Sequence, residues 1–287
     1  MKVGLFAPFT NPFATAEYIR AMGSGAEERG FDSIWVAEHV VLFDEYASQY
    51  PYAADGRIPV PTESGMLDPF PALSFLAACT KTIRLGTGIC LLPQRNPVYT
   101  AKEAATVDWM SNGRLDLGIG VGWLEEEYQA LGVPFERRGA RCRAYIDVLK
   151  TLWCDDISEY EGEFYSLPAT RQFPKPVQQP HPPIHFGGES DAALRRVADL
   201  GQGWYGFNQT AEQVTKRIAK LTSMLEKRGR SREEIEVSIC PYLLGASPEI
   251  IEGYEAAGVD RVILLAAAAN TEAIPEVLDG LAQLAKL

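Results

Sequence analysis

The sequence predicts an α/β fold, most economically a (β/α)8 TIM barrel with insertions, and three observations lead to it. The chain has 287 residues, of which 46% are hydrophobic and 23% are charged, enough for the core of one such barrel. Eight short apolar runs recur along the chain, with stretches of helical spacing between them. The runs are continuous rather than alternating, as expected for strands buried on both faces of a parallel sheet. A doubly wound open sheet is the alternative that this pattern leaves open.

The first half of the chain supplies four expected strands, each rich in Val, Ile, Leu or Phe. They are "KVGLFAPF" (2–9), "DSIWVAEHV" (32–40), "IRLGTGICLL" (83–92) and "RLDLGIGVG" (114–122). Residues 14–30 have helical spacing and close at Gly30, a residue typical of the position after a helix. Two further helices are expected over the apolar segment 69–80, "PFPALSFLAACT", and over 136–153, which contains "YIDVLKTLW".

The second half supplies the other four expected strands. They are "PPIHFGG" (182–188), "GWYGF" (203–207), "IEVSICPYLL" (235–244) and "RVILLAAA" (261–268). A helix is expected over "DAALRRVADL", directly after Ser190, because serine is a favoured N-cap residue. Two more are expected over 210–229, which closes at Gly229, and over 271–286.

Two segments break this rhythm, and we interpret them as insertions in a single barrel domain that spans residues 1–287. Residues 43–67 are rich in tyrosine and proline and follow Glu38 and His39, at the end of the second strand. Barrel enzymes assemble their sites at that end, so an ordered lid is expected, with a surface excursion as the alternative. The second insertion, residues 155–182, includes "YEGEFYSLP" and the proline-rich "FPKPVQQPHPP".

Charge and cysteine content argue against several classes of function. The formal net charge of −11 opposes a nucleic-acid-binding surface, which needs clustered Lys and Arg. We expect no membrane or targeting segment, because no stretch approaches about 18 uninterrupted apolar residues and the N-terminus lacks a cleavage region. The 5 cysteines are scattered without a CxxC pair. Reduced thiols in a cytoplasmic protein are therefore expected.

The second expected strand ends in two groups that resist burial, Glu38 and His39. At the C-terminal end of a barrel strand both would point toward the barrel mouth, where a pocket can hold them without full desolvation. Histidine titrates near neutrality, so His39 is a candidate for proton transfer or for polarising a bound ring. A histidine that only hydrogen-bonds to its surroundings is the alternative.

The glycine-rich stretch "DLGIGVGW", residues 116–123, is not a dinucleotide-binding fingerprint. Gly118, Gly120 and Gly122 alternate along a strand and its end, whereas the GxGxxG pattern needs its third glycine inside a following helix. Glycines at period two remove side chains from one face of the strand. A flat ligand or another backbone can then approach closely, and tight packing inside the barrel is the alternative explanation.

A phosphate site is expected where the strand 182–188 meets the following helix. Gly187 and Gly188 leave room for an anion, and the free N–H groups of a helix that begins after Ser190 would attract it. Glu189 would repel an anion if its side chain turned inward, so only its backbone is expected to face the ligand. An ordinary N-cap also explains Ser190.

Two other patterns carry less weight. His181 and His185 are four residues apart, but the two prolines between them exclude a helical metal pair and no carboxylate cluster supports one, so no metal is expected. The basic run "ERRGARCRAY", residues 136–145, is interpreted mainly as a solvated face. One or two of its arginines could meet an anionic tail at the rim of the site.

Four segments carry a family resemblance: "GFDSIWVAEHV", "LDPFPALSFLAACTKTIRLGTGICLLPQRNP", "KEAATVDWMSNGRLDLGIGVGWLEEEYQALGVPFERRG" and "YEGEFYSLPATRQFPKPVQQPHPPIHFGGES". With them the chain resembles, over nearly its whole length, the luciferase-like monooxygenase superfamily, and more narrowly its branch that uses the deazaflavin coenzyme F420. The resemblance implies a bacterial luciferase-like barrel. These motifs identify the scaffold and the flavin slot more than the substrate.

The resemblance also implies residue roles. His39 matches a histidine that lies beside the flavin or deazaflavin ring and acts in proton transfer, with Glu38 as its acidic neighbour. Gly88 and Ile89 match a bulge of the third strand, where relatives carry a cis peptide bond that presses on the back of the ring. The other implied contacts are Val121, Gly122 and Trp123 at the ring and ribityl chain, and Gly187, Gly188, Glu189 and Ser190 at the phosphate.

Two departures from the bacterial luciferase α chain favour the deazaflavin branch. That chain has a phosphate-binding arginine at the position matching Val121 and a hydroxyl residue at the position matching Ala193. Both positions are apolar here. The resemblance therefore implies a two-electron oxidoreductase in which bound F420 exchanges a hydride with an organic substrate while His39 moves the proton.

Two alternatives remain open. The first is a monooxygenase that uses FMNH2 supplied by a separate flavin reductase, and the second is a non-catalytic flavin-binding protein. Tyr46, Tyr50 and Tyr52, together with Trp123, indicate an apolar, cyclic substrate. Members of the superfamily are commonly homodimers, which makes the helix 69–80 a candidate interface, although ordinary barrel packing also explains its apolar sequence.

Overall fold

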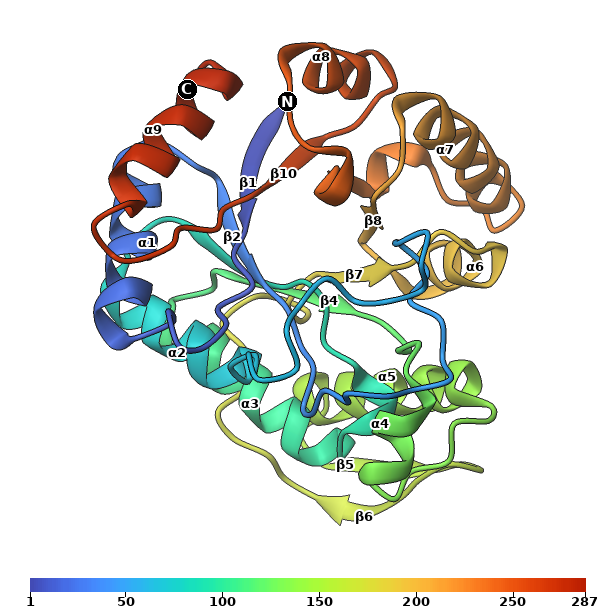
Figure 1. The fold of residues 1–287 in the computed structure, drawn as a ribbon. Coiled ribbons are helices and arrows are strands. Elements are labelled where there is room, and N and C mark those ends of the chain that lie inside the picture. Colours follow the sequence, from blue (N-terminus) through green and yellow to red (C-terminus); the bar gives the residue numbers. More distant parts are fainter.

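The computed structural model describes residues 1–287 and contains a closed barrel of parallel strands (Figure 1). The barrel strands are β1 Lys2–Phe6, β2 Ser33–Val36, β3 Arg84–Thr87, β4 Leu115–Ile119, β7 Ile184–Gly187, β8 Gly203–Phe207, β9 Glu236–Cys240 and β10 Arg261–Leu265. Their order around the barrel is β1-β10-β9-β8-β7-β4-β3-β2. All eight expected strands are confirmed, and closure of the sheet excludes the doubly wound alternative.

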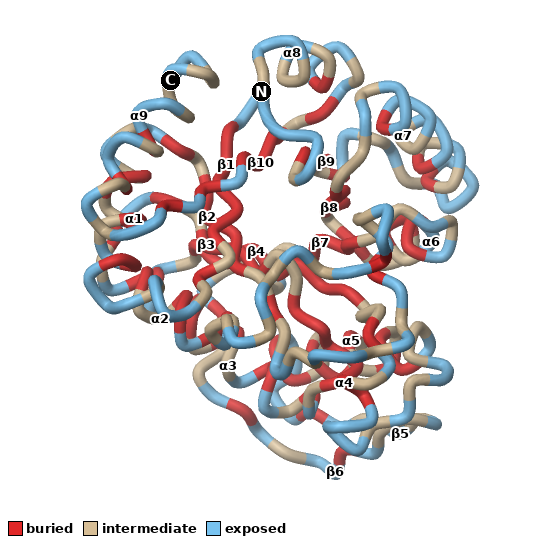
Figure 2. Tube along the Cα trace, in the orientation of Figure 1, coloured by how far each residue is buried: buried red, intermediate tan, exposed pale blue.

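Helices surround the barrel and cover its outer face (Figures 1 and 2). They are α1 Ala16–Glu28, α2 Pro69–Cys79, α3 Pro97–Met110, α4 Glu125–Ala130, α5 Arg138–Cys154, α6 Asp191–Leu200, α7 Ala211–Glu226, α8 Pro248–Ala256 and α9 Ile274–Ala285. Short 3-10 turns lie at η1 Leu92–Gln94, η2 Arg232–Glu234 and η3 Tyr242–Leu244. The expected helices are confirmed with small shifts at their ends. Gly30 and Gly229 follow α1 and α7 with φ values of +79° and +68°, the left-handed conformation that favours glycine after a helix.

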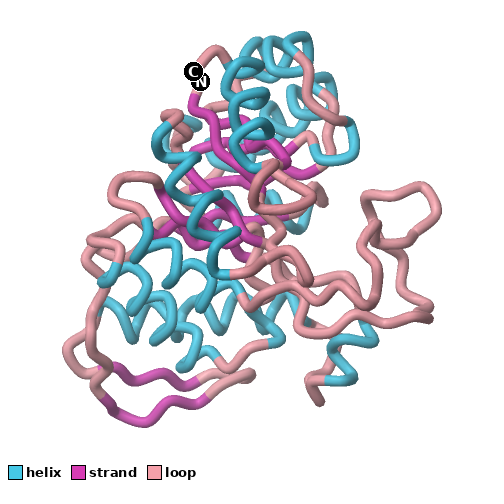
Figure 3. The backbone as a smooth tube through the Cα atoms, turned by 60° about the vertical axis from the view of Figure 1, so that its left-hand side comes forward, coloured by secondary structure: helices cyan, strands magenta, loops and turns pink.

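The second insertion contains an antiparallel hairpin that the sequence did not predict. Strands β5 Ser158–Glu161 and β6 Ser166–Thr170 pair beside α5, apart from the barrel (Figure 3). Both strands are short and mostly polar, so they lack the apolar run that marks the barrel strands. The coil after the hairpin is fixed by Asp108 in α3, whose carboxylate accepts the backbone N–H of Val177 at 2.7 Å.

The apolar core has two parts. The larger part lies between the strands and the surrounding helices, and Figure 2 shows the strands as mostly buried while the outer faces of the helices are exposed. The smaller part lies inside the barrel and consists of Phe6, Trp35, Tyr205, Phe207, Cys240 and Ile263. Because several of these side chains also line the cavity described below, the barrel interior forms the floor of that cavity.

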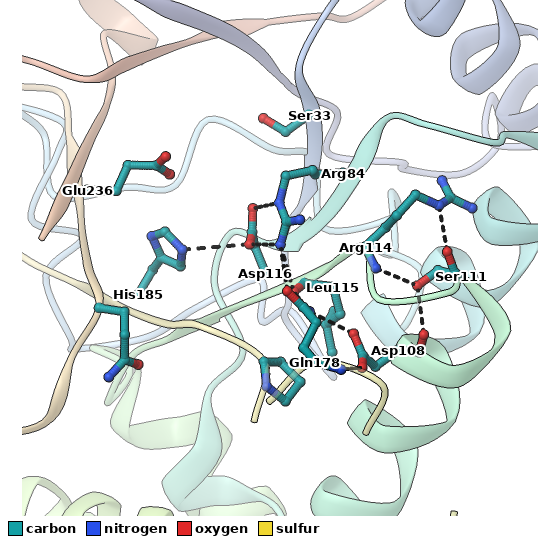
Figure 4. Close-up of polar contacts among 12 residues, drawn as sticks. Ser33, Arg84, Asp108, Ser111, Arg114, Leu115, Asp116, Gln178, His185 and Glu236 are labelled. Atoms are coloured by element: carbon teal, nitrogen blue, oxygen red, sulfur yellow. Dashed lines mark hydrogen bonds and ion pairs between the residues drawn. The ribbon is translucent and has the colours of Figure 1, made fainter. Parts of the chain in front are cut away.

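A buried ion network fills the opposite, N-terminal end of the barrel (Figure 4). Asp116 in β4 accepts a hydrogen bond from Nε of Arg84 at 2.9 Å and lies 3.7 Å from Nη2 of Arg261. Nε2 of His185 lies 3.8 Å from the same carboxylate. Burial alone would raise the pKa of Asp116, but the hydrogen bonds and charge of Arg84 outweigh it and lower that pKa. The network therefore holds an ionised carboxylate at the closed end of the barrel.

The helix expected as a dimer interface, α2, is largely buried within the chain itself. Phe70, Leu73 and Leu76 are at most 2% exposed, because α2 packs against α1 and α3. Large exposed apolar side chains lie instead on α3, where Tyr99 and Trp109 are 73% and 60% exposed. Packing within the chain thus accounts for the sequence of α2, and the homodimer stays a prediction. None of the helices combines the length and the hydropathy needed to cross a bilayer.

Replacing Asp116 by Asn should lower the free energy of unfolding by about 3 kcal/mol, because Arg84 would keep its partly buried charge without its carboxylate partner, while Arg261 keeps Asp32 and Glu236. Urea denaturation of the wild type and the variant measures this difference. The control is Asp156→Asn, at an exposed carboxylate, which should change stability by less than about 0.5 kcal/mol. Equal stability of Asp116→Asn and the wild type would contradict the assigned role of the network.

Candidate active site

A cavity of about 670 Å³ opens at the C-terminal end of the barrel. Residues 43–67 cover it: Figure 1 shows this segment leaving β2, crossing the barrel end toward α6 and returning to α2. Every residue to which the resemblance assigned a role lines this one cavity, namely Glu38, His39, Gly88, Ile89, Val121, Gly122, Trp123, Gly187, Gly188, Glu189 and Ser190, whereas Tyr46 does not. The structure thus brings all of them together, while their roles stay predictions.

The sequence led us to expect Glu38 as the acidic neighbour of His39. In the structure the two side chains do not contact each other. The buried Glu38 carboxylate accepts the backbone N–H of Leu91 at 2.6 Å and Nε of Arg95 at 2.6 Å. Burial raises the pKa of Glu38, and the charge of Arg95 opposes that rise. Both carboxylate oxygens are therefore taken up in holding the chain after β3 against β2. These contacts favour a positioning role for Glu38, and its expected catalytic role stays a prediction.

The carboxylate that contacts His39 is instead Glu127, which the sequence analysis missed. Oε2 of Glu127 lies 3.1 Å from Nδ1 of His39 and accepts Nε2 of Gln94 at 3.0 Å, while Oε1 accepts the backbone N–H of Val40 at 2.7 Å. Burial alone would raise the pKa of the fully buried Glu127, but the hydrogen bond and charge of His39, with the other two donors, lower it. Glu127 is therefore ionised beneath the imidazole.

The Glu127 carboxylate determines which ring nitrogen of His39 carries a proton. An ionised carboxylate only accepts hydrogen bonds, so the contact at Nδ1 requires an N–H at that atom. Nε2 then has no hydrogen bond to the protein, and His39 lines the cavity. The edge of Trp123 lies against the ring, with centroids 5.9 Å apart, and limits its rotation.

Glycines in β4, directly after it and at the end of β7 make room for the end of β3 and the residues that follow it, more than for a ligand. The peptide bond between Gly88 and Ile89 is cis, and Ile89 projects into the cavity wall. A Cβ at Gly120 would lie 2.0 Å from Cδ1 of Ile89, and a Cβ at Gly187 would lie 2.5 Å from the same atom. A Cβ at Gly118 would lie 2.0 Å from the carbonyl oxygen of Thr87. Tight packing around the β3 bulge thus explains this pattern.

At the other end of the cavity, β7 leads into α6 as the sequence predicted. Gly188 has a φ of +100°, and Oγ of Ser190 caps α6 by accepting the backbone N–H of Ala193 at 3.2 Å. The carboxylate of Glu189 accepts the backbone N–H of Phe207 at 2.8 Å and the hydroxyl of Tyr52 at 3.1 Å. Its side chain therefore faces β8 and the covering segment.

The covering segment 43–67 is attached at both ends of the cavity. Near α4, the backbone N–H of Ala47 donates to Glu126 at 2.7 Å, and the ring of Tyr50 lies 5.2 Å from that of Trp123. Near β7, the hydroxyl of Tyr52 in this segment donates a hydrogen bond to the carboxylate of Glu189. The segment is thus an ordered cover, and its movement as a lid stays a prediction.

Comparison with known proteins shows the family and agrees with the barrel fold. A family model described as luciferase-like monooxygenase matches residues 1–272. An uncharacterised protein of Mycobacterium tuberculosis is 30% identical over 243 residues, 85% of this chain and 83% of that protein. The oxygenase component of the flavin-dependent trigonelline monooxygenase of Acinetobacter baylyi is 37% identical over 161 residues, 55% of this chain and 39% of that protein. The structure of the coenzyme F420-dependent tetrahydromethanopterin reductase of Methanopyrus kandleri is similar in fold, with a TM-score of 0.75 and 17% identity over 99% of this chain and 98% of that one.

Glu189 should make the stability of the protein depend on pH. Burial raises the pKa of its carboxyl from 4.5 to about 7, so the folded state binds this proton more tightly than the unfolded state does. The free energy of unfolding should therefore fall as the pH rises from about 4.5 to about 7. Glu189→Gln should remove this part of the decline, as measured by urea denaturation across that range. An unchanged pH profile in the variant would show that Glu189 does not titrate there.

Proposed function

Because the chain belongs to the luciferase-like monooxygenase family, we propose that it is a coenzyme F420-dependent oxidoreductase that transfers a hydride to or from a small organic substrate. The family comprises flavin- and F420-dependent oxidoreductases and monooxygenases. The observation that carries the proposal is the His39–Glu127 pair, which turns one imidazole nitrogen toward the cavity. Reduction of a carbonyl or a conjugated double bond by hydride also needs a proton, and this nitrogen is placed to supply it.

The cavity fits a flavin or deazaflavin in size and lining. Its volume of about 670 Å³ falls within the range of small-molecule sites, and most of its wall is apolar side chain or backbone. Ile89 forms one wall, and the Gly188 turn leaves the far end open to a phosphate. When bound, F420 supplies a hydride donor or acceptor at C5 of its ring.

The residues of this chain contribute position, proton transfer and exclusion of water. His39 holds or donates a proton at Nε2, and the contact of Glu127 with Nδ1 fixes the orientation of the ring. Tyr50 and Tyr52 of the covering segment close the cavity above the strand ends. Their aromatic rings keep water from the reacting atoms.

The lining supports an apolar substrate. Phe13, Ile58, Met66 and Leu265 line the cavity together with the tyrosines of the covering segment. Near the strand ends, the polar side chains of the lining besides His39 are few and include Glu189 and the hydroxyls of Tyr205 and Tyr242. We therefore propose a small, largely apolar organic molecule with one oxidisable or reducible group.

A second candidate function is an FMNH2-dependent monooxygenase that receives reduced flavin from a separate reductase. The observation in its favour is the similarity to the oxygenase component from Acinetobacter baylyi. The same cavity would hold FMN, since the contacts at the ring are mostly backbone and apolar. A non-catalytic flavin-binding role does not account for a buried, ionised Glu127 beneath an imidazole in the cavity.

The purified protein should bind oxidised F420 more tightly than FMN, by roughly tenfold or more. Fluorescence and absorbance titrations under identical conditions measure both affinities. Tighter binding of FMN, together with oxygen consumption in the presence of reduced FMN, would replace this proposal with the monooxygenase. Binding of neither compound would remove both candidates.

His39→Ala should lower kcat by roughly 10²- to 10⁴-fold, while F420 binding stays within about twofold of the wild type. Glu127→Gln should lower kcat on the order of 10²-fold, because an amide N–H at Nδ1 favours the wrong tautomer of His39. The readout is the absorbance of F420 during turnover of a substrate found by screening small carbonyl and cyclic unsaturated compounds.

The matched control is Glu125→Gln, which removes an exposed carboxylate from the same helix and should leave kcat unchanged. Full activity of His39→Ala would refute proton transfer by His39. Equal losses in Glu125→Gln and Glu127→Gln would refute the positioning role of Glu127.

A further inference from the structure

One arginine at the cavity has no partner within the protein. Arg196 lies in α6, less than two turns after the N-cap Ser190, and lines the cavity beside Gly188, Ser190 and Ala193. Its guanidinium takes part in no hydrogen bond or ion pair, and Nε is buried without an acceptor. A half-buried guanidinium without an anion or acceptor is costly, because desolvation of the charge is not offset.

Other arginines of the chain show that this situation is unusual here. Arg114 and Arg141 are buried without a carboxylate, but both donate to backbone carbonyls, for example from Arg141 to Pro134 at 2.6 Å. Arg143, on the neighbouring helix α5, pairs with Asp199. The chain has 38 acidic residues against 27 basic ones, so the lack of a partner for Arg196 does not reflect a shortage of carboxylates.

The surroundings of Arg196 add to the positive potential at this end of the cavity. Burial lowers the pKa of Arg196, and the charges of Arg143 and Arg138 act in the same direction. Arg138 also lacks a carboxylate partner: its Nε donates to the carbonyl of Gly122 at 3.2 Å, and its guanidinium lies over the ring of Phe135. The N-terminus of α6 contributes a further partial positive charge at the same place. An anion bound there would relieve the repulsion among these groups.

We propose that Arg196 is the residue whose guanidinium binds the phosphate of the cofactor. This inference rests on the proposed function, since it assigns a new residue to the cofactor site. The bacterial luciferase α chain has a phosphate-binding arginine at the position that matches the apolar Val121. In this chain, α6 after β7 would supply the cation for the phosphate instead of the end of β4. A guanidinium and the N–H groups at a helix start are a combination suited to phosphate.

The test compares cofactors with and without their phosphate. FMN is compared with riboflavin, and F420 with its phosphate-free deazaflavin chromophore, by equilibrium fluorescence titration. Arg196→Gln should weaken binding of the phosphate-bearing forms roughly ten- to a hundredfold, the usual effect of losing a charge-assisted hydrogen bond. Binding of the phosphate-free forms should stay within about twofold. Arg196→Lys should recover part of the loss, because it keeps the charge.

The matched control is Arg195→Gln, which removes the same charge from an exposed position next to Arg196 on the same helix. It should bind all four compounds as the wild type does. Unchanged binding of FMN and F420 by Arg196→Gln, or equal weakening with and without phosphate, would overturn the assignment and leave the proposed function intact. If the wild type bound none of the four compounds, the proposed function would fail and the assignment of Arg196 with it.

Discussion

Charge compensation inside an apolar barrel is the constraint on which this structure depends. Three carboxylates, Asp116, Glu38 and Glu127, are at most 5% exposed, and each is matched by donors from the chain itself. Asp116 uses arginines at the N-terminal end of the strands, where it closes the barrel. Glu38 and Glu127 lie at the C-terminal end and hold the chain segments that form the cavity. A buried carboxylate without such partners would be protonated or would destabilise the fold.

Three glutamates, Glu126, Glu127 and Glu189, connect the covering segment to the rest of the site. Neighbouring residues of α4, Glu126 and Glu127, bind the start of the covering segment and the imidazole of His39, respectively. At the far end, Glu189 joins the cover to β8 through Tyr52 and Phe207. The cover therefore contacts the elements that also position His39, the proposed proton-transfer group, and the proposed phosphate site. A displacement of α4 would disturb the cover and His39 together.

The barrel and the location of its site were predictable from sequence because both follow from local patterns. Continuous apolar runs mark strands buried on both faces, and the ends of those strands must meet at one mouth. The contacts of Glu127 were not predictable, because it is one of three successive glutamates whose burial depends on the placement of α4 beneath His39. The sequence likewise gave no sign that Glu38 turns toward Arg95 or that Arg196 has no partner. Such facts depend on side-chain direction in the assembled barrel.

The charge at the phosphate end also bears on the choice of cofactor. F420 carries its phosphate as a diester with one negative charge, whereas the monoester of FMN carries about −1.5 to −2 at pH 7. Arg196 is the one guanidinium lining the cavity, and Arg138 is already bonded to Gly122 and stacked on Phe135. Glu189 is nearby, and above its pKa of about 7 it adds a negative charge that a dianion would meet more strongly than a monoanion. With the partial positive charge at the N-terminus of α6, Arg196 can bind either ester, and the Glu189 carboxylate disfavours the dianionic monoester more strongly above its pKa of about 7. This contrast at the phosphate is part of the argument for the proposed deazaflavin.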